Sequence, residues 1–201
     1  MDLILEKLIN SIFQIMLFAA LPFICWFINA RKKQSFFNWI GLKKITGGKK
    51  TRTAIFIVTI FFVIIGTFTL YEIRNVKTAT YEFSGLGLNA IPAIIIYAAF
   101  NTSLPEEVLF RGFLLKRLKK IFSFNIANII QAGLFGVLRG FMFHSLVGYT
   151  TMILIILFTG IVAWLMGRIN ELYSDGSILP SWIIHALANV FSGICSAFLI
   201  F

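Results

Sequence analysis

Acidic residues are scarce in this chain of 201 residues, which has 8 Asp and Glu against 18 Lys and Arg, and only 13% charged residues in total. With 59% hydrophobic residues, it has too few polar side chains to cover a water-soluble core. An ordinary soluble globule is therefore excluded. The basic residues stand in short clusters between apolar runs, so the positive charge indicates membrane topology, and we expect no nucleic-acid partner.

Cysteine is almost absent, and several familiar hydrolase motifs are missing. Cys25 and Cys195 both fall within apolar runs, where a thiol packs as a small hydrophobe, so we expect no disulfide. The sequence has neither the H-E-x-x-H motif of zinc peptidases nor the G-x-S-x-G motif of serine hydrolases. Any hydrolytic chemistry must come from other polar residues.

Long apolar runs are what the sequence has in abundance, and about 20 such residues cross a bilayer. We predict an all-α, multi-pass transmembrane helix bundle with about six spans that enclose a polar intramembrane cavity. The spans are expected at residues 8–28, 54–71, 88–118, 125–143, 149–167 and 181–201. Residues 88–118 could form one helix or two broken helices. The bundle is expected to be one membrane domain, with two N-terminal helices in residues 1–87 and a core in residues 88–201.

The loop between the first two spans holds eight basic residues and no acidic one, which predicts that it is cytoplasmic. The N-terminus is then outside, and we expect an integral protein of the bacterial plasma membrane. Residues 36–42 of this loop are aromatic and predict a topology anchor at the headgroups or, alternatively, an anionic-lipid site. The basic residues of the loop are Arg31, Lys32, Lys33, Lys43, Lys44, Lys49, Lys50 and Arg52.

The segment S-L-P-E-E-V-L-F-R at residues 103–111 places two carboxylates among apolar spans. A charge that faces hydrocarbon costs several kcal/mol, so both carboxylates should face protein or a wet cavity. Ser103 and Glu106 match a capping box, with Pro105 in the first turn, which predicts that a helix begins here. Glu107 and Arg111 are four residues apart and share a helix face.

One arginine leaves one surplus carboxylate, and a carboxylate in a desolvated site suits general acid–base chemistry. Glu106 is the better candidate base, because Glu107 has Arg111 as its natural partner. The alternative is a structural ion pair next to a glutamate that only caps the helix.

Three more polar residues interrupt the later spans. Arg139 lies near one end of its span, where it either extends to the headgroups or pairs with the surplus glutamate. His185 and Asn189 are four apart on one helix face. They are either hydrogen-bonded core residues or donors to an oxyanion that forms during acyl transfer.

Three motifs in these regions resemble the CPBP family of CAAX proteases and bacteriocin-processing enzymes, also called the Abi family. They are E-E-V-L-F-R-G (106–112), Q-A-G-L-F-G-V-L-R (131–139) and G-S-I-L-P-S-W-I-I-H-A-L-A-N (176–189). The resemblance implies an intramembrane endopeptidase of the glutamic or metallo type that cuts a membrane-associated or lipidated peptide with glutamate-activated water. It implies that Glu106 is the base, that Glu107 and Arg111 support it, and that His185 and Asn189 stabilise the oxyanion.

The second motif departs from the family pattern, because Arg139 stands where the family has a histidine. Arginine stays protonated and accepts no hydrogen bond, so it cannot bind a metal or exchange protons, and it holds a nearby glutamate ionised. A divalent metal is therefore disfavoured, and we expect no other cofactor. His144 is a poor substitute, since five helical residues turn it about 140° away and shift it by about 7.5 Å.

Two other functions stay open from the sequence. A catalytically impaired family member could act as a bacteriocin self-immunity factor or bind another membrane protein. A transporter with a proton-coupled glutamate is the third alternative, because the number of spans alone does not distinguish it from the others.

Overall fold

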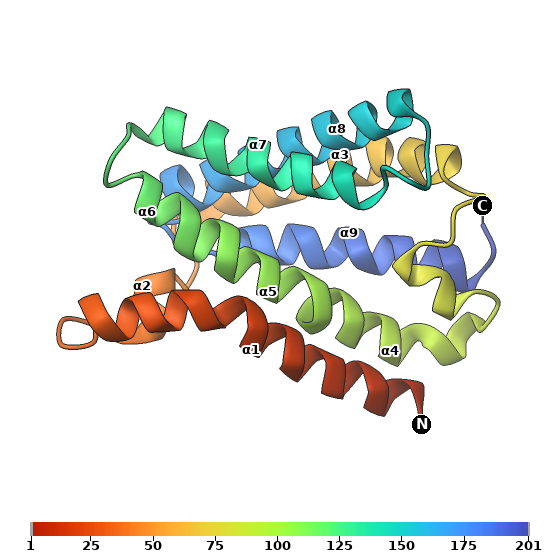
Figure 1. Cartoon of the computed structure of the whole chain (residues 1–201), viewed down its shortest axis with the longest axis horizontal. Coiled ribbons are helices and arrows are strands. Elements are labelled where there is room, and N and C mark those ends of the chain that lie inside the picture. The colour runs from red at the N-terminus through yellow and green to blue at the C-terminus, as the bar shows by residue number, and fades with distance from the viewer. Residues whose placement is uncertain (1, 201) are drawn as a thin grey trace.

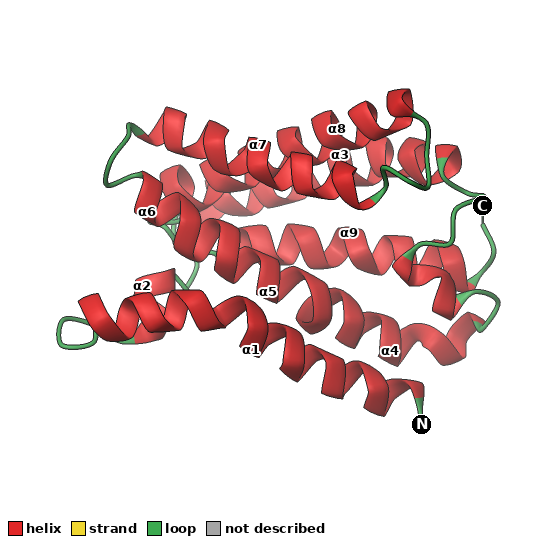
Figure 2. Cartoon of the chain, in the orientation of Figure 1, coloured by secondary structure: helices red, strands yellow, loops and turns green. Residues whose placement is uncertain are grey.

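The computed structural model describes residues 2–200, and within that range it contains helices and no strand. The long helices lie beside one another and are joined by short loops (Figure 1 and Figure 2). This confirms the predicted all-α bundle. The α-helices are α1 (Leu3–Asn29), α2 (Phe36–Ile40), α3 (Gly48–Glu72), α4 (Ile91–Ile96), α5 (Leu104–Glu107), α6 (Lys116–Leu118), α7 (Phe124–Met142), α8 (Tyr149–Arg168) and α9 (Leu179–Ala197).

Five helical stretches are long and apolar enough to cross a membrane, at residues 3–29, 48–72, 87–118, 149–173 and 179–197. Their side chains are arranged for a lipid solvent. In α1, for example, Lys7 and Ser11 are buried, whereas Ile12 and Phe13 are exposed. Polar side chains that point inward and apolar ones that point outward are what a helix in hydrocarbon requires.

The remaining predicted span corresponds to α7, which has 19 residues but is not among these five. It carries Asn128, Gln131 and Arg139, which lower its apolar content. It nevertheless lies along α8 in the bundle (Figure 1). The last predicted span was expected to end at Phe201, which lies outside the described residues.

The prediction that a helix begins at Ser103 is wrong. Residues 87–118 form one continuous helical stretch, and the Ser103 side chain makes no capping hydrogen bond there. The short α5 is instead flanked by π-helical segments at Tyr97–Ser103 and Val108–Leu115. Pro105 has no N–H for the carbonyl four residues earlier, and a π-helix moves the hydrogen bonds to the next residue along. The helix therefore continues through Pro105, with π-helical segments on both sides.

Two glycines bring α7 close to α8. A Cβ atom on Gly136 would lie 2.5 Å from the Ile156 carbonyl oxygen, and one on Gly140 would overlap the Ile156 side chain. Small residues at these positions let the two backbones approach closely, as is common between membrane helices. This contact fixes α7, and with it Arg139, relative to the rest of the bundle.

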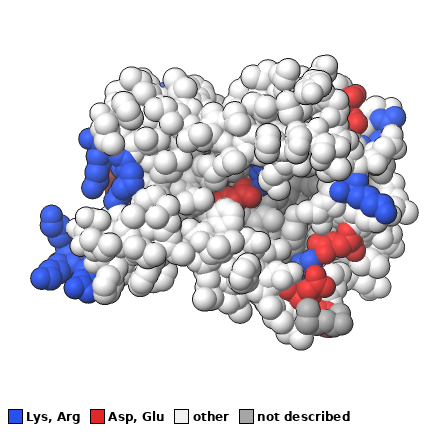
Figure 3. Space-filling view, viewed as in Figure 1, with Lys and Arg blue, Asp and Glu red and all other residues white. Residues whose placement is uncertain are grey.

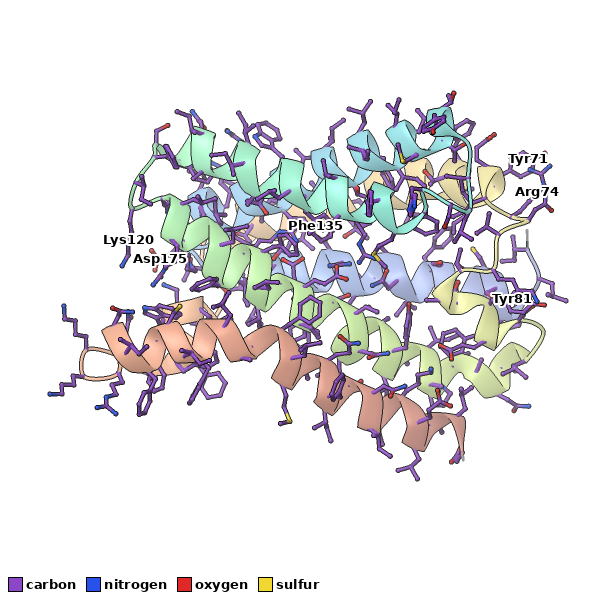
Figure 4. The ribbon with its side chains drawn as sticks, in the orientation of Figure 1. Tyr71, Arg74, Tyr81, Lys120, Phe135 and Asp175 are labelled. Atoms are coloured by element: carbon purple, nitrogen blue, oxygen red, sulfur yellow. The ribbon has the colours of Figure 1, made fainter. Side chains whose placement is uncertain are left out.

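The two ends of the bundle differ in charge. Lys120 and Asp175 lie at the end that carries α2 and α6, whereas Tyr71, Arg74 and Tyr81 lie at the opposite end (Figure 4). Lys and Arg dominate the first of these ends in the space-filling view (Figure 3). Loop residues 31–52 and the cluster at 116–120 both contribute to it. We call it the basic end.

The aromatic segment at residues 36–42 is largely folded into the protein at the basic end. Trp39 and Ile40 are buried, and the Trp39 ring lies 5.9 Å from that of Phe113. Only Phe37 of this segment is strongly exposed among its large apolar residues. The segment therefore anchors the loop to the bundle.

Candidate active site

The Glu107 carboxylate is fully buried and has two partners. Its Oε1 lies 3.0 Å from Nη1 of Arg111, which is also fully buried, and 3.1 Å from Nδ1 of His185. Arg111 lies one helical turn later on the same helix, as the spacing of four residues predicts. The Arg111 guanidinium also packs over the Phe135 ring, 4.5 Å from its centroid. Three elements, residues 87–118, α7 and α9, therefore meet at this carboxylate.

The Glu106 carboxylate faces another direction and is less enclosed. Its Oε2 lies 2.5 Å from Nη2 of Arg139 and 3.7 Å from Nε2 of His185. The side chains of Glu106 and Arg139 are 17% and 24% exposed. Of the two roles predicted for Arg139, the structure has the ion pair with the surplus glutamate.

His185 lies between the two glutamates. Its Nδ1 faces Glu107, and its Nε2 faces Glu106. Each ring nitrogen therefore faces a carboxylate and can donate a hydrogen bond when it carries a proton. The edge-on Phe135 ring, 6.1 Å away between centroids, closes one side of this histidine. Figure 4 shows Phe135 near the middle of the bundle.

Asn189 is one turn from His185 on α9, but its amide already has partners. Its Nδ2 donates to Thr102 Oγ1 at 2.8 Å and to Ser103 Oγ at 3.1 Å. Both acceptors lie at the end of the π-helical segment Tyr97–Ser103. In this state Asn189 therefore fixes the π-helical segment against α9, and it contacts neither glutamate directly.

A cavity of about 200 Å³ adjoins the cluster. Its polar lining includes Arg139, His185 and Asn189, and much of the remainder comes from apolar residues of α3 and α8. Thr78 and Thr80, in the loop after α3, also line it, so the cavity extends from the cluster toward the end opposite the basic end. Acidic and basic atoms are visible together in a hollow near the middle of one face (Figure 3).

Some residues of this site did not stand out in the sequence. Tyr97 lines the cavity, and Thr102 accepts a hydrogen bond from the Asn189 amide. Tyr97 and Thr102 lie in the π-helical segment, whose register a 3.6-residue period does not describe. Gln131, in contrast, faces α8 and donates to Asn128 Oδ1 at 2.9 Å. The exposed ring of His144 stacks on Phe141 at the end of α7, outside the site.

The model of the type II CAAX prenyl endopeptidase Rce1-like family matches residues 88–191, just over half of the chain. This chain belongs to the Rce1-like family. The resemblance to CAAX proteases that the three motifs carry is thereby confirmed. No curated protein and no solved structure matches the chain. Membership in this family, together with the five apolar helices, identifies an integral membrane protein.

The donor set at the site does not fit the metal ion proposed for CAAX proteases of this type. Within residues 2–200, no group of three or more His, Cys, Asp and Glu side chains is arranged to hold a metal. Arg139 places a guanidinium on Glu106, and Arg111 places another on Glu107. A metal cation at this site would lie close to the positive charges of both arginines. In a poorly solvated site this repulsion is only weakly screened. We therefore derive no catalytic step through a metal.

Proposed function

We propose that this Rce1-like protein is an intramembrane endopeptidase in which Glu106 activates the attacking water. The observation that supports this most is the convergence of Glu106, Glu107, Arg111 and His185 beside a cavity at mid-bundle. Buried charges inside a membrane protein are costly and commonly mark function. The cavity beside Arg139 and His185 supports a catalytic role over an ion pair that only stabilises the fold.

The reaction needs one proton carrier and donors for the oxyanion. Glu106 takes a proton from water while the water oxygen bonds to the carbonyl carbon of the scissile peptide. The carbonyl oxygen becomes an oxyanion, which the N–H groups of Arg139 that do not face Glu106 and a protonated Nε2 of His185 stabilise. Glu106 then returns its proton to the amide nitrogen as the C–N bond breaks, which yields a carboxylic acid and an amine.

The other members of the cluster hold these groups in position. Glu107 orients His185 through Nδ1, and Arg111 compensates the Glu107 charge. Asn189 becomes an oxyanion donor only if the substrate displaces Thr102 or Ser103 from its amide. Its present role is to position the π-helical segment against α9.

The substrate we propose is a membrane-associated or lipidated peptide that reaches the cavity from within the bilayer. The apolar lining from α3 and α8 suits a lipid chain or apolar side chains, and Arg139 and His185 suit the peptide backbone. We further propose that the basic end is cytoplasmic, that the N-terminus is outside, and that the membrane is a bacterial plasma membrane.

One observation favours a second function. The proposed base Glu106 is engaged in a 2.5 Å ion pair with Arg139, which must open before this carboxylate oxygen can take a proton from water. A non-catalytic family member, such as a bacteriocin self-immunity factor or a partner of another membrane protein, would keep the scaffold and tolerate this pairing.

Cleavage of a farnesylated CAAX peptide by protein in liposomes, followed by mass spectrometry, tests the two functions. For the peptidase, we expect measurable cleavage that falls by at least about 100-fold in Glu106→Gln. The control is His144→Gln, which should cleave at the wild-type rate because His144 lies outside the site.

Arg139→His is the decisive variant. It restores the histidine of the family motif but removes the proposed oxyanion donor, so a peptidase that uses Arg139 should cleave more slowly. Cleavage by Arg139→His together with an inactive wild type would identify the natural protein as non-catalytic. Equal protection against a bacteriocin by wild type and Glu106→Gln would support the same conclusion.

A further inference from the structure

A second cavity lies between α3 and α8 at the basic end, away from the candidate active site. Its volume is about 600 Å³, and its walls come from the first turns of α3 and from residues 165–173. Val58 and Ile169, which line the cavity, pack with Val162 in one buried apolar cluster that holds the two helices together. We call this cavity the α3–α8 groove.

Three basic side chains line the groove, and none of them has a carboxylate partner among residues 2–200. They are Lys49, Lys50 and Arg168. Instead, Lys50 Nζ lies 4.3 Å from the centroid of Tyr173, and the Arg168 guanidinium lies 4.9 Å from that of Trp164. Contacts with aromatic faces orient these cations but leave their hydrogen-bond donors available.

The acidic residues at this end are already occupied by other cations. Glu171 pairs with Lys116, at 3.1 Å, and with Lys119. Asp175 pairs with Lys43 at 2.9 Å. Within residues 2–200, Glu171 and Asp175 are the only acidic residues near the groove. The positive charge of the groove is therefore uncompensated in this part of the chain.

The groove also changes from polar to apolar along the helix axes. α3 begins at the basic end with Lys49 and Lys50, and Ile57 lies about two turns deeper. α8 approaches the same end, so Leu165 lies about one turn deeper than Arg168. The cations therefore sit at the level of the headgroups, and the apolar walls extend into the hydrocarbon region.

We propose that the α3–α8 groove binds one anionic phospholipid, with its phosphate among Lys49, Lys50 and Arg168 and one acyl chain along Ile57 and Leu165. A basic pocket between membrane helices is suited to an acidic headgroup, and the polarity gradient matches a molecule that is charged at one end and apolar at the other. A free phosphate or an acidic peptide would use only the shallow part. This site is separate from the proposed peptidase chemistry and does not depend on it.

The test measures binding of dioctanoyl phosphatidylglycerol to the full chain in a non-ionic detergent, by native mass spectrometry. Dioctanoyl phosphatidylcholine and glycerol phosphate are the comparison ligands. We expect phosphatidylglycerol to bind much more tightly than either. Equal binding of phosphatidylcholine would overturn the role of charge, and equal binding of glycerol phosphate would overturn the role of the acyl chain.

Two sets of variants assign the binding to the groove. The triple variant Lys49→Gln, Lys50→Gln, Arg168→Gln should bind phosphatidylglycerol on the order of a hundredfold more weakly. Each cation removed should lower the affinity roughly fivefold, and the three effects multiply. Its control is Lys32→Gln, Lys33→Gln, Lys44→Gln, which removes the same charge from residues that do not line the groove. If the control loses as much affinity as the triple variant, the binding is general surface electrostatics and the proposal fails.

Ile57→Trp tests the deep part of the groove with every charge retained. The larger side chain should block the acyl chain and weaken phosphatidylglycerol at least about tenfold, through roughly 1.4 kcal/mol. Ile60→Trp is its control, because Ile60 is exposed on the same helix and does not line the groove. Unchanged binding by Ile57→Trp would show that no acyl chain lies there.

Discussion

Glu106 and Glu107 are neighbours in the chain, yet they lie in two different regions of the molecule. Glu107 is completely buried, and the protein supplies its partners Arg111 and His185. Glu106 is 17% exposed and pairs across to Arg139 on α7. A helix turns about 100° per residue, so one step along it moves a carboxylate from the packed interior to the partly exposed side that faces Arg139. The first region should determine stability, and the second should be free to serve function.

The largest effect that this comparison predicts is on the buried side. Arg111→Ala leaves the Glu107 carboxylate without its cation, and stranding a buried charge in this way costs about 3–5 kcal/mol. The free energy of unfolding in mixed detergent and SDS should fall by that amount. Arg52→Ala is the control, because Arg52 is exposed on α3, and it should change stability by less than about 0.5 kcal/mol. A loss in Arg111→Ala no greater than in the control would contradict the assignment of this region to stability.

An intermediate effect is expected where α7 is held against α8. Gly136→Ala places a Cβ 2.5 Å from a backbone oxygen, so the helices must separate at a cost of about 1–3 kcal/mol. Gly133→Ala is a matched control on the same helix, since a Cβ there meets nothing within 4 Å. The same unfolding measurement should show no loss for Gly133→Ala. Equal losses would contradict this, because alanine favours a helix more than glycine does and the close approach at Gly136 would then not account for the cost.

A small effect is expected at the partly exposed Glu106. Glu106→Gln removes the ion pair with Arg139, but both side chains are partly exposed and water can solvate the arginine that remains. We expect the free energy of unfolding to change by less than about 1 kcal/mol. Glu107→Gln, measured beside it, should be clearly more destabilising. If the two variants lost stability equally, the contrast between the regions would be refuted.

The charge partners in both regions follow from simple spacing. Four residues separate Glu107 from Arg111, and the surplus glutamate made Arg139 one of two alternatives, a cation partner or a residue that extends to the headgroups. Spacing also placed His185 and Asn189 on one face, but the partners of Asn189 were not predictable. Thr102 and Ser103 face its amide because of the π-helical segment, and Ser103 instead suggested a helix start that does not exist. Local capping patterns describe how isolated helices begin, whereas this helix continues through Pro105 with π-helical segments on both sides.

The smallest effect belongs to a third carboxylate, which provides a reference outside the membrane. Asp175 pairs with Lys43 at 2.9 Å, and its side chain is 80% exposed. This hydrogen bond and the lysine charge hold the pKa of the Asp175 carboxyl below its usual range. Because this pKa is lower in the folded than in the unfolded protein, the pair stabilises the fold at pH values above the pKa of the unfolded state. The stabilisation is lost as the pH falls through the pKa of the folded state.

Melting curves of the wild type and Asp175→Asn should therefore differ slightly at pH 7 and converge as the carboxyl becomes protonated. Asparagine suits this comparison because residue 175 has a φ of 50°, a left-handed conformation that asparagine adopts readily. The difference at pH 7 should also shrink in high salt, which screens exposed charges. A difference that persists at low pH would show that the substitution acts through the backbone turn. The Asp175→Asn comparison would then not measure the stability that an exposed ion pair contributes, and it could not serve as a reference for Glu106 and Glu107.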